Sequence, residues 1–271
     1  MKRLLLVLLA MLSIPVTAAE TGKTYALVSA IGSSIAYTRL KMATGSHLEP
    51  YERATLALPN ASMDVAALRG LEGVVKQTDP EARFVYLRLN PAELDGVATP
   101  RRGETALGKL ATALERMPER AGWHQVLLLA PRYVPYEREM LGSKLQGIGL
   151  YVQPFERSKL DPGDEINGRD DAEAISPRGE AVRASSFIAP YFYAQVWVLD
   201  ARTLEVLYTA ERFDYQRIYD PQSAAISIER ALPPQTLGPM VESFVEKASA
   251  RALRDAIGVV TVTEPRVVQP R

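Results

Sequence analysis

The chain has 271 residues, with 32 Lys and Arg against 32 Asp and Glu, two His and no Cys. The balanced charge gives no support for a nucleic-acid-binding protein, which normally carries a basic excess. Without cysteine the chain has no disulfide, no thiol nucleophile and no cysteine-ligated zinc or iron–sulfur site. The length suits one large domain or two small ones.

The first residues have the features of an export signal. A cationic start precedes an apolar run over residues 4–14, and Pro15 and several small residues follow it. The run is shorter than the roughly 20 residues that cross a membrane. We therefore expect a signal peptide over residues 1–18, cleaved near Ala18 or Ala19, and a periplasmic or secreted protein without a membrane anchor. A lipid anchor is excluded because it requires a cysteine at the cleavage point.

Predicted strands and helices alternate along the rest of the chain. Apolar or alternating runs predict strands, and apolar residues at three- and four-residue spacing predict helices. Strands are expected at residues 24–31, 34–42, 52–58, 83–89, 126–130, 147–152, 187–199 and 204–208. Helices are expected after an N-cap at Ser62, over residues 107–117, and over residues 239–257 with Pro239 in the first turn.

This order predicts one α/β domain over residues 19–258, with a mixed sheet and two to three packed helices. Hairpins give antiparallel strand pairs, and strand–helix–strand units give parallel ones. Residues 156–184 are polar and rich in turn formers, so we expect a long flexible loop there, either functional or disordered. Residues 259–271 are expected to form a loose C-terminal tail.

Two serines follow the first predicted strand, in the sequence Gly32-Ser33-Ser34. In α/β folds, ligands commonly bind at the carboxyl ends of strands. Ser33 or Ser34 can act as a nucleophile if a histidine and a carboxylate converge on it. The G-x-S-x-G motif is absent, and so is a Gly-Asp-Ser start. The alternative is a turn in which the serine hydroxyls make local hydrogen bonds.

The remaining candidates for chemistry are the histidines and one arginine. His47 lies in a predicted turn and His124 precedes a predicted strand, and either can serve as a general base. Their positions do not match a zinc motif. Arg132 follows the strand at 126–130 and is a candidate anion contact. We count Ser33, Ser34 and Arg132 as the candidate binding residues.

No cofactor or metal is expected from the motifs in the chain. The phosphate-binding glycine motifs GxxxxGK[ST] and GxGxxG are absent. The acidic stretch at 156–184 invites a calcium interpretation, but alignment to an EF-hand loop places Gly163 at the first ligand position and Ala174 at the twelfth. A solvated loop is therefore the better interpretation of this stretch.

Residues 193–207 resemble a hairpin of bacterial envelope proteins, in which a strand, an Asp-x-x-Thr-Gly turn and a Glu-Val-Leu strand follow one another. These proteins include the curli secretion channel, the penicillin-binding-protein activator lipoproteins and the amino-terminal domain of the Tol–Pal propeller protein. The resemblance implies a small α/β domain that acts in assembly and partner binding rather than catalysis. This chain departs from the pattern at Leu204, where the hairpin usually has Gly.

Two hypotheses about function follow. The favoured one is an exported, non-catalytic binding or assembly protein that contacts another envelope protein. The alternative is a serine-type hydrolase that uses Ser33 or Ser34 with His47 or His124, and Arg132 as an anion contact. The partner and the oligomeric state stay open.

Overall fold

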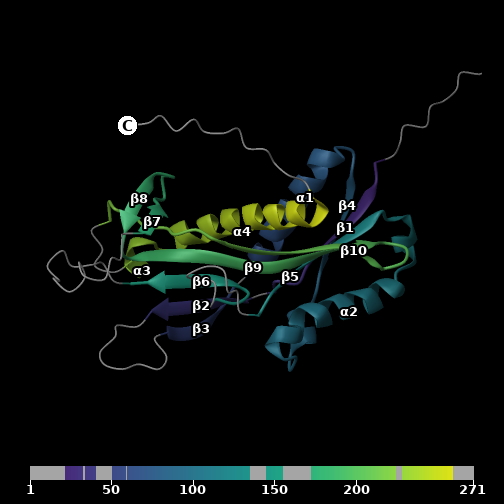
Figure 1. Ribbon diagram of the computed structural model, residues 1–271, viewed down its shortest axis with the longest axis horizontal. Helices are drawn as coiled ribbons and strands as arrows, with labels where there is room; N and C mark the ends of the chain where they lie inside the picture. The colour runs from purple at the N-terminus through teal and green to yellow at the C-terminus, as the bar shows by residue number, and fades with distance from the viewer. Residues whose placement is uncertain are drawn as a thin grey trace, which may run out of the picture.

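A mixed β-sheet with helices on both faces forms the body of the protein (Figure 1). The computed structural model describes residues 22–32, 34–40, 51–58, 60–134, 145–154, 172–223 and 228–258. The expected signal peptide and tail, together with Ser33 and His47, lie outside these ranges. The α/β class and the mixed sheet predicted from the sequence are confirmed.

Every strand expected from the sequence is present. The main sheet consists of β1 (Thr24–Ser29), β2 (Ser34–Leu40), β3 (Tyr51–Ala57), β4 (Arg83–Arg88), β5 (Gln125–Pro131), β6 (Ile148–Gln153), β9 (Phe187–Asp200) and β10 (Val206–Tyr215). A separate two-stranded sheet consists of β7 (Ala172–Ile175) and β8 (Ala181–Ala184). The β9–β10 hairpin follows the turn expected at Asp200, and β10 is longer than predicted.

The long strand β9 organises the sheet. One of its edges pairs with β10, and its other edge pairs with β6 and then β5, all antiparallel. Because β5 and β6 lie end to end along β9, they form one line interrupted between Pro131 and Ile148. The strands β1 and β2 form a second such line, since β1 runs parallel to β5 and β2 runs parallel to β6. Beyond them, β4 is parallel to β1 and β3 is antiparallel to β2.

In the described part of the chain, three long helices cover the sheet. One face is covered by α1 (Ser62–Thr78) and α4 (Pro234–Ile257), and the other by α2 (Arg102–Glu115), as Figure 1 shows. A fourth helix, α3 (Ile228–Ala231), is a single turn. Almost all of β9 is buried because both of its faces are covered, which explains its nearly continuous apolar sequence.

The aromatic residues around β9 mostly pack within the sheet. Tyr191, Phe192 and Tyr193 are at most 2% exposed, and Phe213 packs edge-on against Tyr193. Tyr208, by contrast, is 54% exposed. Most of these aromatic side chains therefore pack the sheet, in keeping with the strand propensity of aromatic residues.

Two helix starts differ from the sequence expectation. Ser62 is the first residue of α1 rather than its N-cap, which is Ala61 and makes no side-chain capping bond. The last helix begins at Pro234, and Pro239 lies inside it. Proline fits the first helical position because its missing N–H would have no partner there, and Pro234 supplies that signal earlier in the chain than Pro239.

The expectation of a flexible loop over residues 156–184 is wrong for residues 172–184, the part of this range that the structure describes. Residues 172–184 form the β7–β8 hairpin, with a turn at Gly179 where φ is +84°. Ile175 also forms a backbone bridge with Ile218, which ties the hairpin to the body of the protein. The sequence signal was missed because strands of four residues are too short to show a period.

Candidate functional site

The line formed by β1 and β2 and the line formed by β5 and β6 are both interrupted, and the two interruptions are neighbours in the sheet. The backbone leaves the first line between β1 and β2, where Gly32 has a φ of +88°. It leaves the second after Pro131 and returns at Gly147, whose N–H donates to the carbonyl of Arg132 over 2.7 Å. Interruptions of this kind place loop residues at the carboxyl ends of the parallel strands β1, β4 and β5, the usual location of ligand sites in α/β folds.

A small pocket of about 130 Å³ lies at this interruption. Its polar lining residues are Ser34, Asp95, Arg102 and Tyr133. The guanidinium of Arg102 is 5.8 Å from the centre of the Tyr133 ring, and its Nε donates to the carbonyl of Val97 over 3.3 Å. Burial raises the pKa of the Tyr133 hydroxyl, so it stays protonated and can donate a hydrogen bond. The pocket has room for a few water molecules or a small polar group.

A buried carboxylate supports this interruption from the helix layer. Asp64, in the first turn of α1, is 1% exposed. Its Oδ1 accepts a hydrogen bond from the Ser29 hydroxyl at 2.6 Å and one from the Gly32 N–H at 3.3 Å. Its Oδ2 makes no hydrogen bond, and the nearest cation is the guanidinium of Arg88 at 4.0 Å. Burial raises the pKa of Asp64 despite these contacts.

The structure brings some of the sequence-predicted residues together. The strand ends at Gly32 and Pro131 are neighbours, and Ser34 lines the pocket with both of them. Arg132 follows directly, but its guanidinium bonds to Glu211 over 2.6 Å and to Gln195 over 2.9 Å. Arg132 therefore links strands of the sheet and does not project into the pocket as an anion contact.

Ser34 and His124 lie beyond opposite ends of β1. The backbone N–H of His124 donates to the carbonyl of Thr24, at the amino end of β1, whereas Ser34 follows the carboxyl end of that strand. The length of β1 alone separates them by roughly 16 Å. This pair therefore cannot form the nucleophile and base of a hydrolase. Pairings with Ser33 or His47 lie outside the described residues.

Sequence reasoning missed the buried carboxylate of this region. A carboxylate in the first turn of a helix commonly interacts with the helix N-terminus, yet that of Asp64 turns inward to Ser29. The available signal was Ser29 itself, a polar residue inside an otherwise apolar strand. A buried hydroxyl of this kind requires a partner, and the first turn of the next helix supplies it.

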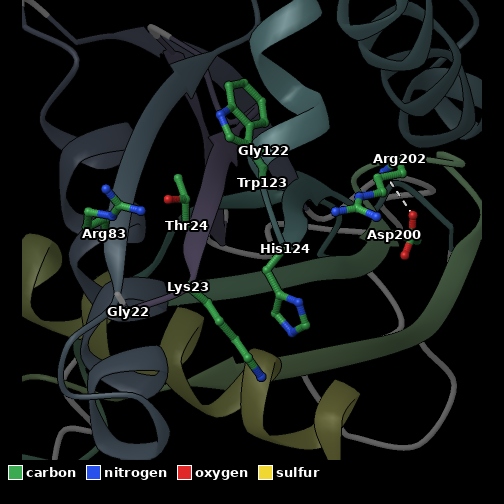
Figure 2. A pocket seen from close by; sticks show the side chains of 9 residues that line it. All are labelled: Gly22, Lys23, Thr24, Arg83, Gly122, Trp123, His124, Asp200 and Arg202. Atoms are coloured by element: carbon green, nitrogen blue, oxygen red, sulfur yellow. Dashed lines mark hydrogen bonds between the residues drawn. The ribbon is translucent and has the colours of Figure 1, made fainter. Parts of the chain in front are cut away.

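A second pocket, of about 430 Å³, lies at the amino ends of the same parallel strands (Figure 2). Lys23 precedes β1, Arg83 begins β4, His124 precedes β5, and Asp200 and Arg202 come from the β9–β10 turn. Figure 2 shows the side chains of Lys23 and His124 extending in the same direction, with Arg202 on one side of them and Arg83 beyond Thr24. No sequence motif marked this set, because its members come from four separate segments.

The chain matches no known protein family and no curated protein sequence. Among the helices of the described ranges, none combines the length and apolar character needed to cross a membrane. The same ranges contain no group of three or more His, Asp or Glu side chains placed to hold a metal ion.

Proposed function

We propose that the chain is an exported, non-catalytic binding or assembly protein of the bacterial envelope, and that it contacts its partner protein through the outer edge of β10. The observation that carries this proposal is the exposed start of that strand. Val206, Leu207 and Tyr208 are 46%, 44% and 54% exposed, and within the described residues β10 pairs only with β9.

An open sheet edge can pair with a strand of another chain unless charged residues or proline on the edge prevent it. The charges of β10 lie further along the strand and are already paired. Arg212 and Asp214 bond to each other at 2.7 Å, and Glu211 bonds to Arg132. The first three residues of β10 thus present apolar side chains without charge protection, although a shift in pairing register between Val206 and Tyr208 bends this part of the edge.

Two features of the sequence support the same role. The stretch that resembles envelope assembly proteins, residues 193–207, corresponds to the β9–β10 hairpin and ends at this exposed edge. The cationic start and apolar run before residue 19 favour export to the envelope. An apolar, unguarded edge on an exported protein is a suitable surface for a second protein.

Site-specific photocrosslinking in cells tests the proposal. A photoreactive residue at Tyr208 should yield one reproducible adduct with an envelope protein. The matched control is a photoreactive residue at Thr112, which is exposed on α2. Adding Leu207→Lys beside the Tyr208 probe should abolish the adduct while circular dichroism shows a folded protein. A lysine on an edge strand disfavours pairing with another chain. Absence of an adduct at Tyr208, or the same adducts at both positions, would contradict the proposal.

A further inference from the structure

The pocket at the amino ends of β1, β4 and β5 has an unbalanced charge. Lys23, Arg83 and Arg202 contribute three cations to its lining, and Asp200 contributes the one carboxylate. The whole chain, by comparison, has a formal net charge of zero. Within the described ranges, no carboxylate lies within ion-pair distance of the three cations. A concave surface with excess charge of one sign concentrates the field and attracts ions of the other sign.

The carboxylate of Asp200 is already engaged by its own turn. Its Oδ1 accepts hydrogen bonds from the backbone N–H groups of Arg202 and Thr203, both at 2.8 Å. These bonds, first of all the one from Thr203, lower the pKa of Asp200, so it stays ionised. Asp200 therefore shapes the turn and offsets only part of the positive charge around it.

The side of the pocket that contains Arg202 is held in place by hydrogen bonds within the protein. The Nε of Arg202 donates to the carbonyl of Ala121 over 3.3 Å. In the reverse direction, Arg120 donates to the carbonyls of Ala201 and Arg202, each over 2.7 Å. These contacts join the short helix Pro118–Gly122 to the β9–β10 turn. A guanidinium held in this way loses little conformational entropy when it binds an anion.

His124 completes the pocket as a group whose charge can change. Burial is the main cause that lowers its pKa, and the charge of Lys23 adds to it, whereas Asp200 and Asp79 act in the opposite direction. Its ring also packs edge-on against Tyr25, with the ring centres 5.3 Å apart. An anion bound between His124 and the neighbouring cations would offset the repulsion from Lys23 and favour the protonated imidazole.

We propose that this pocket binds a small molecule bearing an oxyanion group, a phosphate or a carboxylate, held by Lys23, Arg202 and Arg83 with His124 beside it. Guanidinium and ammonium groups donate charge-assisted hydrogen bonds to both kinds of oxyanion. The volume of about 430 Å³ exceeds that of a bare inorganic ion, so the remainder of the ligand occupies the space beside Trp123 and Thr24. This inference is independent of the partner-binding edge at β10.

Histidine NMR on the full-length protein tests it, because the chain has only two histidines. A His124→Gln variant assigns the two ring signals, and His47 serves as the internal reference. Inorganic phosphate, succinate and sodium chloride are titrated at equal ionic strength. We expect a saturable shift of the His124 signal with phosphate or succinate and a rise in the pKa of His124. The anion with the higher affinity identifies the preferred group. The same small, non-saturating response to all three salts would overturn the proposal.

Substitutions in the pocket distinguish binding at a specific site from general electrostatic attraction of anions to the protein. Lys23→Gln and Arg202→Gln should each weaken binding by roughly ten-fold or more, because each removes a charge-assisted hydrogen bond. The matched control is Arg116→Gln, an exposed arginine at the end of α2, which should leave affinity unchanged. Arg202→Lys keeps the charge and should retain part of the affinity. Unchanged affinity in Lys23→Gln and Arg202→Gln, with thermal melting showing folded proteins, would overturn the proposal.

Discussion

The hydroxyl of Ser29 donates a 2.6 Å hydrogen bond to the carboxylate of Asp64, and both residues are at most 1% exposed. This bond connects the last residue of β1 to the first turn of α1. The same carboxylate accepts the N–H of Gly32, where the chain turns out of the sheet. One buried charged group therefore fixes the end of a central strand, the interruption after it and the start of the helix above it.

Removing the Ser29 hydroxyl should destabilise the protein. In Ser29→Ala the buried carboxylate loses its shortest hydrogen bond, and we expect the free energy of unfolding to fall by about 1–3 kcal/mol. Chemical denaturation measures this change. Thr112→Ala, which removes an exposed hydroxyl bonded to its own helix, is the control and should change stability by less than about 0.5 kcal/mol. Equal effects of the two substitutions would show that the Ser29–Asp64 bond adds no stability.

The raised pKa of Asp64 predicts a particular pH dependence. Burial lifts this pKa above its ordinary value of 3.8, so the folded protein binds the proton more tightly than the unfolded chain does. The contribution of this proton to stability is fully present below pH 3.8 and is lost as the pH rises through the folded-state value. We expect the unfolding free energy of the wild type, relative to Asp64→Asn, to decrease as the pH rises above 3.8 and then to level off. A relative stability that increases over this range would indicate a lowered pKa.

An ion-pair network attaches α4 to the outer strand β10. Asp214 accepts from Arg212 at 2.7 Å and from Arg251 at 2.9 Å, and Arg212 also reaches Asp255 at 2.7 Å. Hydrogen bonding to Asp214, followed by that to Asp255, raises the pKa of Arg212. Asp214→Ala leaves both arginines without this shared partner, so we expect a loss of about 1–2 kcal/mol that shrinks at high salt.

A double-mutant cycle isolates the coupling across this network. Asp214→Asn and Arg251→Gln should show a coupling free energy of about 0.5–1 kcal/mol in urea denaturation. The comparison pair is Glu72 and Lys76, four residues apart on α1, for which about 0.3–0.5 kcal/mol is expected. A coupling for Asp214 and Arg251 that falls below the helix pair would mean that the network does not secure α4.

Leu204 has a backbone conformation that favours glycine. Its φ is +61° in the β9–β10 turn, and its side chain packs against the cluster under α2. We expect Leu204→Gly to lie within about 0.5 kcal/mol of the wild type, because relief of backbone strain offsets the lost apolar contact. Leu204→Val keeps an apolar side chain but adds a β-branch, and should lose about 1 kcal/mol or more. Thermal denaturation compares the variants, with Leu207→Val as the control. If Leu204→Gly is as destabilised as Leu204→Val, strain does not govern this position.

The resemblance of residues 193–207 to the envelope-protein hairpin stays a prediction, and Leu204 is the position where this chain departs from that pattern. The pattern usually has Gly where this chain has Leu204, and Leu204 has a left-handed backbone conformation that glycine adopts without strain. The apolar contact of Leu204 beneath α2 compensates for part of the cost. The hairpin could be predicted from the sequence because its turn is local.

Local patterns were sufficient for most of the fold. The apolar runs that became β1, β5 and β9, and the helical spacing of α1 and α2, are properties of neighbouring residues and are visible in the sequence. The aromatic residues of β9 are buried because both faces of this strand are covered. Short elements such as β7 and α3 were missed, since four residues do not define a period.

The sequence by itself determined the class of fold, the position of the principal strands and helices, and the absence of thiol chemistry. Only the tertiary structure decided which distant residues meet. It placed Ser34 and His124 beyond opposite ends of β1, turned Asp64 inward to Ser29, and gathered Lys23, Arg83 and Arg202 around one pocket. The physical reason is that secondary structure follows from local periodicity, whereas a site depends on strand order, and strand order is set by burial and pairing between segments far apart in the chain.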